Sequence, residues 1–213
     1  MTDDIASGKS LRGTWVELRG DAASPPLFAA RMALTMARLG PCRKSRRGAA
    51  VYRSVPEVGV LGARHYAIPV KNASAGAGAG FNGPPMTLAI GGARPAWATC
   101  DGSEACRRDC GRRCVHAEVR AVMALLEEDR AMAPHLHMVH VKIPAHGEEM
   151  PPRPDGISNH AGLPSGGPSC IDCSKFLLDA CFGGIWLYES RGWRYYTAAA
   201  FHHATVASTG VHG

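Results

Sequence analysis

The stretch VHAEVRAVMALLEEDRAMAPHLHMVHVKI, residues 115–143, sets the expected fold. Its first half predicts a helix from Val115 to about Glu128, because apolar side chains recur there at helical spacing. Its second half, Leu136 to Ile143, is rich in apolar and β-branched residues and predicts a strand. A helix that is followed closely by a strand is typical of α/β domains.

The same alternation continues on both sides of this stretch. Before it we expect a helix, two short strands joined by a turn around Ser54–Pro56, and a Gly/Ala/Pro-rich loop, over residues 27–39, 49–52, 59–62 and 72–96. After it we expect a helix, a strand, a further short strand and a last helix, over residues 169–180, 184–188, 195–196 and 197–205. Strands that alternate with helices predict a sheet with helices on both faces.

Length and composition indicate a single domain. The chain has 213 residues, of which 46% are hydrophobic and 20% charged, and this is enough for one full core. We expect the domain to cover residues 24–205, with an arm over 1–23, a tail over 206–213 and a Pro/Gly-rich insertion over 144–167. No leader-like segment opens the chain and no apolar run reaches the roughly 18 residues of a membrane helix, so we expect a soluble, cytoplasmic protein without a membrane partner.

The charge of the chain leaves two interpretations open. The net charge is +6, and the excess is local, in the run Arg43-Lys44-Ser45-Arg46-Arg47 and in four arginines between residues 107 and 113. These residues form either a solvated basic surface or a site for a phosphorylated or polyanionic ligand.

Two short motifs carry the residues of a hydrolytic metal site. His116-Ala117-Glu118 supplies an imidazole and a carboxylate, and Cys170-Ile171-Asp172-Cys173 supplies two thiols at the start of a predicted helix. Zinc takes nitrogen and sulfur ligands in a tetrahedron, and a catalytic site keeps the fourth position for water. Glu118 is then the proton carrier, and H-x-E followed by P-C-x-x-C is the known signature of zinc nucleobase deaminases, which this chain matches except that Ser169 separates Pro168 from Cys170. The alternative is a buried cysteine pair and an unrelated surface His-Ala-Glu.

On these residues the chain resembles the zinc-dependent cytidine/deoxycytidylate deaminase superfamily, and most closely its deoxycytidylate (dCMP) branch. The resemblance covers roughly residues 25–190 and includes four further segments: the first strand around 45–51, the loop Gly80-Phe81-Asn82-Gly83-Pro84-Pro85, the approach Cys114-Val115, and the strand 184–188. It implies a cytidine deaminase-like fold, with three α/β/α layers around a mixed sheet of about five strands. The chain departs from the family in the long insertion over 144–167, which we expect to act as a lid beside the site.

The resemblance assigns roles to individual residues. His116, Cys170 and Cys173 would ligate zinc, and Glu118 would move a proton from the attacking water to the ring nitrogen and then help ammonia leave. Four further residues are candidate substrate contacts: Asn82, the backbone amide of Ala117, the ring of Phe81, and Ser169, which stands where the family has the proline before the first cysteine. For Asn82 an ordinary turn residue is the alternative.

A second group of cysteines precedes the His-Ala-Glu motif. Its members are Cys100, Cys106, Cys110 and Cys114. They resemble the structural zinc site of several dCMP deaminases, in which four thiolates leave no position for water. The alternative is a loop of reduced, partly buried cysteines.

The function expected from the resemblance is hydrolytic deamination of a cytosine nucleotide or nucleoside, dCMP or a relative, by an enzyme acting on the C–N bond of a cyclic amidine. One alternative is a cytosine deaminase that acts on DNA or RNA, for which nucleic acid would be the partner. A non-enzymatic, zinc-stabilised binding module is a third class, in which Glu118 has no expected role. Relatives are often oligomers, so a homo-oligomer is expected.

Overall fold

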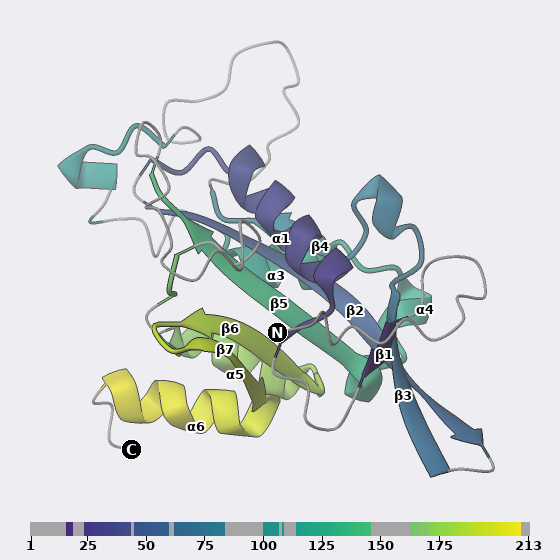
Figure 1. Cartoon of the computed structure of the whole chain (residues 1–213). Helices are drawn as coiled ribbons and strands as arrows, with labels where there is room; N and C mark the ends of the chain where they lie inside the picture. The colour runs from purple at the N-terminus through teal and green to yellow at the C-terminus, as the bar shows by residue number, and fades with distance from the viewer. Residues whose placement is uncertain are drawn as a thin grey trace.

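The computed structural model describes residues 16–18, 24–43, 45–59, 62–83, 100–106, 108, 114–145, 163–165, 167–168 and 170–209. Seven strands form one sheet: β1 Val16–Leu18, β2 Arg46–Gly59, β3 Gly62–Pro69, β4 Ala79–Phe81, β5 Leu136–Ile143, β6 Gly184–Glu189 and β7 Gly192–Thr197 (Figure 1). The helices include α1 Leu27–Leu39, α3 Ala117–Met123, α4 Glu127–Arg130, α5 Ile171–Asp179 and α6 Ala198–Thr209, with short 3-10 turns η1 Ala73–Ala75 and η3 Ala133–His135 and a short helical segment at residues 104–106 and 108.

The sheet is mixed, with strand order β1-β3-β2-β5-β6-β7. The one parallel pair is β5 with β6, and all other neighbours are antiparallel. Strand β4 pairs with residues 48–50 of β2, just beyond the segment of β2 that pairs with β3. The long hairpin of β2 and β3 projects past the rest of the sheet (Figure 1).

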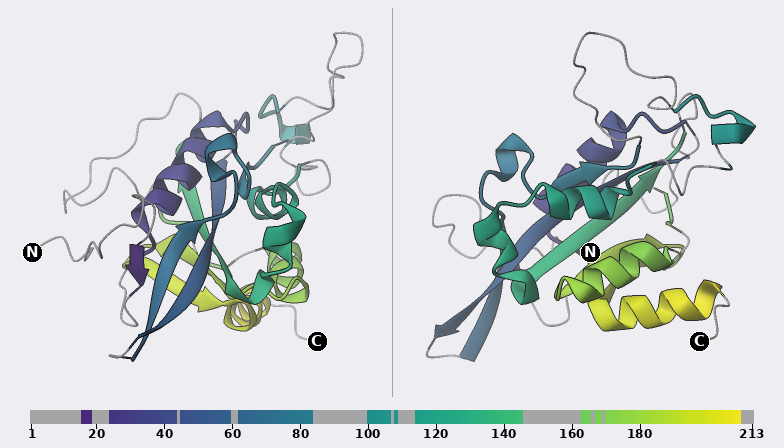
Figure 2. Two further views of the ribbon diagram at one scale, coloured as in Figure 1. Left: turned by 90° about the vertical axis from the view of Figure 1, so that its right-hand side faces the viewer. Right: turned by 180° about the vertical axis from the view of Figure 1, so that it is seen from behind.

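Side chains that alternate along the central strands divide the core into two clusters. On β2, Ala50 and Tyr52 face the layer that contains α1, whereas Ala49 and Val51 belong to the cluster on the opposite face. That opposite cluster includes buried residues of α3, α5 and α6, and the views in Figure 2 show these helices across the sheet from α1. The prediction of an α/β domain with helices on both faces is therefore confirmed, with seven strands in place of about five.

The contact between α1 and β2 depends on Gly48. A Cβ at this position would lie against the backbone of Ala33 and Ala37 in α1, which cannot move aside as a flexible side chain can. We expect Gly48→Ala to lower the free energy of unfolding by about 1–3 kcal/mol through overpacking, measured by denaturant unfolding. Gly40→Ala is the control, because Gly40 has a φ of −62° that alanine adopts and its Cβ would have more room. An equal loss in both variants would contradict this account.

The predicted turn around Ser54–Pro56 was wrong. Residues 46–59 form one continuous strand, and the chain reverses after Gly59. Pro56 is tolerated because β5 pairs only with residues 46–53 of β2, so the distal part of β2 has β3 alone as a neighbour. Proline has no N–H, so it is tolerated in a strand segment that has no hydrogen-bonded neighbour strand on one side.

The predicted helix over 115–128 is divided into α3 and α4. The carbonyls that would continue α3 are taken by other groups: Gly78 N–H donates to Ala124 O, and the Arg130 guanidinium donates to the carbonyls of Met123 and Leu125. The helix therefore stops at Met123, and Leu125 is buried in the turn that follows.

Other boundaries differ from expectation in three places. Within the predicted arm, Val16–Leu18 pairs with β3 as an edge strand. The predicted loop over 72–96 contains η1 and β4, and its residues beyond Gly83 lie outside the described part of the chain. The last helix continues to Thr209, past the domain end expected at residue 205. Most of the insertion over 144–167 also lies outside the described residues.

Among the helices that are described, none has both the length and the apolar character needed to cross a bilayer.

Candidate metal and proton-transfer site

Two helices begin at the residues that the motifs predicted as metal ligands. His116 is the N-cap residue of α3, and Cys170 is the N-cap residue of α5. The Cys170 sulfur accepts a hydrogen bond from the backbone N–H of Cys173, 3.3 Å away, which places both sulfurs on the first turn of α5. A sulfur at a helix N-terminus is favoured as thiolate by the exposed amides and the helix dipole.

The structure brings the three side chains together. His116 Nδ1 lies 3.1 Å from Cys170 Sγ and 2.9 Å from Cys173 Sγ, although 54 residues separate His116 from the first cysteine. The three ligand atoms all lie within 4.8 Å of one another, and in the part of the chain that the structure describes no other His, Cys, Asp or Glu group meets this condition. Cys173 is fully buried, and the other two residues are partly exposed.

The donor set fits a small, borderline-soft cation. From the usual Zn–S and Zn–N bond lengths, the N···S edge of a tetrahedral site is about 3.6 Å, so the donors need to separate by only about 0.6 Å. Two sulfurs and one imidazole are ligands that zinc accepts, and three protein ligands leave one coordination position open. These residues can therefore bind a metal ion of this kind.

The three groups of the cluster shift one another's pKa values. The pKa of Cys170 falls to about 5, first because of the hydrogen bond with Cys173 and also because of the one with His116. The pKa of Cys173 rises, because of the hydrogen bond with Cys170 and because of burial. The hydrogen bond to Cys170 also raises the pKa of His116. A cation that binds here replaces protons that the three groups otherwise share.

A cavity of about 380 Å³ opens at the cluster. It is lined by Cys42, Ser45, Arg47, Asn82, Cys114, His116, Ala117, Glu118, Cys170, Ile171 and Asp172. Its volume falls in the range of small-molecule sites, about 300–1,000 Å³. The lining thus includes two of the metal donors, the carboxylate of Glu118 and two of the four predicted substrate contacts, Asn82 and Ala117.

Glu118 is the buried acid of this cavity. It sits in the first turn of α3, with 6% of its surface exposed, and is not one of the clustered ligands. Burial raises its pKa, but His140, the Glu118 backbone amide and Arg47 oppose this, and the net pKa is lowered. Burial lowers the pKa of His140 to about 4. The net lowering of the pKa favours the ionised form of Glu118, which can accept a proton.

The loop that carries Asn82 is tied to the start of α3. Gly83 and Val115 exchange two backbone hydrogen bonds, of 2.8 and 3.2 Å, directly before His116. Asn82 is held in turn by β2: its Oδ1 accepts from Arg47 N–H at 2.6 Å, and its Nδ2 donates to Ser45 O at 2.7 Å. The side chain of Asn82 therefore stabilises the start of β2 by two hydrogen bonds. Its contact with a substrate stays a prediction.

Phe81 and Ser169 are not placed in the cavity. Phe81 ends β4, does not line the cavity, and has the Arg120 guanidinium 4.7 Å from its ring centroid. That cation occupies a face on which a base was expected to stack, so stacking on Phe81 stays a prediction. Ser169 lies outside the described residues.

The second group of cysteines is seen only in part. The sulfurs of Cys100 and Cys106 lie 3.7 Å apart, and Cys100 accepts a hydrogen bond from Arg43 N–H. Cys114 lines the cavity beside His116, and Cys110 lies outside the described residues. Among the described cysteines Cys100, Cys106 and Cys114 do not form a three-ligand group, so a second metal site stays a prediction.

Two residues of the site lie outside the two metal motifs, although Arg47 belongs to the basic run that the sequence offered as a phosphate site. Arg47 and His140 lie on β2 and β5, on the sheet face that α3 covers. Each is a polar residue next to apolar residues on that face. Ala49 and Val51 follow Arg47 at alternate positions of β2, and Leu136 and Met138 precede His140 at alternate positions of β5. A polar residue at the core-facing position of a central strand was the signal that could have found them.

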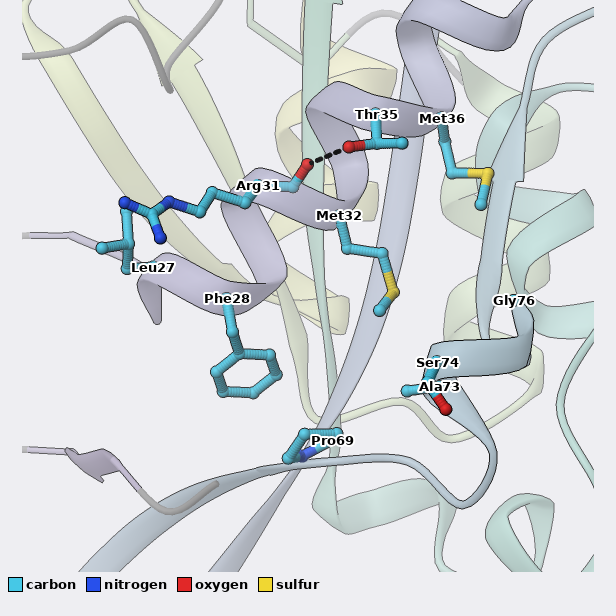
Figure 3. A pocket seen from close by; sticks show the side chains of 10 residues that line it. All are labelled: Leu27, Phe28, Arg31, Met32, Thr35, Met36, Pro69, Ala73, Ser74 and Gly76. Atoms are coloured by element: carbon cyan, nitrogen blue, oxygen red, sulfur yellow. Dashed lines mark hydrogen bonds between the residues drawn. The ribbon is translucent and has the colours of Figure 1, made fainter. Parts of the chain in front are cut away.

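A larger hollow of about 580 Å³ lies along α1, beside η1 and the end of β3 (Figure 3). In that view the side chains of Phe28 and Met32 point from α1 toward Pro69 and η1. The lining is mostly apolar and contains no cysteine, histidine or carboxylate. The smaller cavity, with its metal donors and buried acid, is therefore the candidate catalytic site.

No protein-family model matches this chain, and no curated protein sequence is significantly similar to it.

Proposed function

We propose that the protein is a zinc-dependent hydrolytic deaminase that converts the cytosine of a nucleotide or nucleoside such as dCMP to uracil and releases ammonia. The proposal depends on one observation above all. A buried carboxylate that is not in the ligand cluster lines the same cavity as two of the three donors, His116 and Cys170. A purely structural zinc site has no need of such a carboxylate, whereas hydrolysis needs a group that moves protons.

Each residue has a defined part in the proposed reaction. His116, Cys170 and Cys173 would hold the zinc ion, which would supply the Lewis acidity that makes a water molecule nucleophilic near neutral pH. A carboxylate oxygen of Glu118 accepts a proton from the attacking water and delivers it to N3 of the cytosine ring. Water oxygen bonds to C4, the second water proton passes through Glu118 to the amino group, and the C4–N bond breaks. The products are uracil and ammonia, which balances cytosine and one water.

The volume of the cavity, about 380 Å³, supports a free nucleotide or nucleoside as the substrate. Cys42, Asn82 and Ala117 line it as buried residues, and the side chain of Asn82 is fixed at both ends. The DNA or RNA deaminase remains the second candidate, because Arg47 and Arg43 place positive charge at this end of the molecule.

A substrate panel separates these functions. We expect the zinc-loaded protein to release ammonia from dCMP, dCTP, deoxycytidine or cytosine, with one of these clearly preferred. A uracil-excision assay on a cytosine-containing oligonucleotide tests the second candidate in the same preparation. Activity on the oligonucleotide alone would replace the first proposal by the second, and no activity on either would favour the binding module.

Arg47 is expected to contact the phosphate of a nucleotide substrate. It lines the cavity, is partly buried, and its guanidinium makes no hydrogen bond or ion pair with any residue that the structure describes. A charge-assisted hydrogen bond contributes about 1.5–3 kcal/mol, so Arg47→Gln should lower kcat/KM for dCMP by about 10–100-fold more than for deoxycytidine. The exposed Arg38→Gln is the control. Equal losses on both substrates would show that Arg47 acts on the reaction in general and does not bind phosphate.

A further inference from the structure

His140 is the least expected residue near the candidate site. It is 1% exposed, and neither ring nitrogen has a hydrogen-bond partner among the described residues. An unsatisfied buried polar group costs about 1–3 kcal/mol, and such groups are few in native proteins. An apolar side chain at this position of β5 would avoid that cost, so the ring calls for a functional explanation.

The His140 ring has apolar neighbours within the sheet and a carboxylate at short range. In the sheet, His140 stands between Ala49 of β2 and Leu187 of β6, which are both buried in the apolar cluster under α3. Across from it, His140 Nε2 lies 3.6 Å from Glu118 Oε1. A shift of a few tenths of an ångström closes this distance to a hydrogen bond.

The chemistry of the pair fixes the direction of that bond. Because burial keeps the ring neutral near pH 7, one nitrogen carries a hydrogen and the other a lone pair. A carboxylate offers only acceptors, so the nitrogen that faces Glu118 must be the donor. The Glu118 backbone amide and the Cys173 side chain also interact with the carboxylate, so His140 adds to the groups that fix its orientation.

We propose that His140 is a positioning residue for Glu118: its Nε2–H holds the carboxylate in the orientation that faces the cavity. This inference rests on the proposed function, in which Glu118 moves the proton. His140 touches neither the metal donors nor the substrate in this role, and it acts only through Glu118. A misplacement of a reacting group by about 1 Å can cost about 100-fold in rate, so the orientation of one carboxylate matters.

Kinetics of two variants test the role. The variant His140→Leu has a side chain of similar volume and lacks the hydrogen-bond donor. We expect its kcat to fall by about 10–100-fold and its KM to stay within about twofold of the wild type. Its thermal midpoint should be unchanged or higher, because two unsatisfied buried nitrogens are removed. His140→Gln offers an amide donor and should recover most of the lost kcat. The exposed His135→Gln is the control. Full kcat in the leucine variant, or equal loss in both variants with lowered thermal midpoints, would overturn the proposal in favour of simple packing.

Nuclear magnetic resonance of the ring nitrogens gives a readout that needs no turnover. In the full-length zinc-loaded protein at pH 7 we expect His140 to be the neutral, Nε2-protonated tautomer, and Glu118→Ala to shift its Nε2 resonance. A Nδ1-protonated ring, or ring resonances that do not respond to Glu118→Ala, would refute the contact. If no substrate is deaminated, the proposed function fails while this measurement still decides the His140–Glu118 contact, so the two failures are distinguishable.

Discussion

Glu118→Gln should lose about 10²–10⁴-fold in kcat on the preferred cytosine substrate, the range that general acid–base catalysis contributes. The amide has nearly the shape of the carboxylate but cannot take a proton from the attacking water. Glu118 contacts the buried end of the cavity and is outside the ligand cluster, so zinc content should stay unchanged. Steady-state ammonia release and metal analysis on the same preparation measure the two quantities.

The control for this variant is Glu127→Gln. Glu127 is an exposed acid of α4, near in sequence and outside the cavity, and its replacement should leave kcat within about twofold because surface substitutions rarely matter. Retained turnover in Glu118→Gln, with the fold and the metal intact, would remove Glu118 from the reaction. The binding-module alternative would then be favoured.

Cys173→Ser should abolish metal binding and, with it, turnover. Purified wild-type protein is expected to hold one zinc per chain, or two if the second cysteine group also binds. Because loss of a residue that merely supports a ligand weakens metal affinity by about 10–100-fold, loss of a buried thiolate ligand should exceed about 100-fold. Zinc removal by a chelator should lower the thermal midpoint of the wild type and leave that of the variant unchanged, since only the former is stabilised by bound metal.

Cys181→Ser is the control for Cys173→Ser, because it tests whether the loss of any cysteine has the same effect as the loss of a residue of the cluster. Cys181 is exposed and lies outside the three-residue group, so its replacement should change neither zinc content nor thermal midpoint. A wild-type protein that contains no zinc after purification under reducing conditions, and takes up none when zinc is added, would refute the metal site itself.

The motifs were sufficient to find the ligands because their chemistry is local. His116 stands at the start of one helix and Cys170 at the start of another, and the i, i+3 spacing places Cys173 on the same turn as Cys170. Residue type and spacing determine such an arrangement before any tertiary contact forms. The apolar and β-branched residues over 136–143 likewise predicted a strand, which the structure contains as β5.

The errors arose where distant segments decide a local conformation. The pairing of β2 with β5 ends at Arg53, and this end of the pairing allows Pro56 to stay within β2. The sequence around residues 54–56 does not indicate where that pairing ends. The end of α3 depends on Gly78, almost fifty residues earlier, whose N–H takes the carbonyl of Ala124. Sequence periodicity does not report such competition for hydrogen bonds.

Residue types and their spacing thus determined the helix starts, the alternating strands and the four side chains of the proposed chemistry. Only the tertiary structure decided that Arg47 and His140 face Glu118, that Asn82 braces β2, and that Phe81 lies under Arg120. The reason is physical. A side chain's partners across a sheet or beneath a helix depend on strand register and helix placement, which the whole chain sets together.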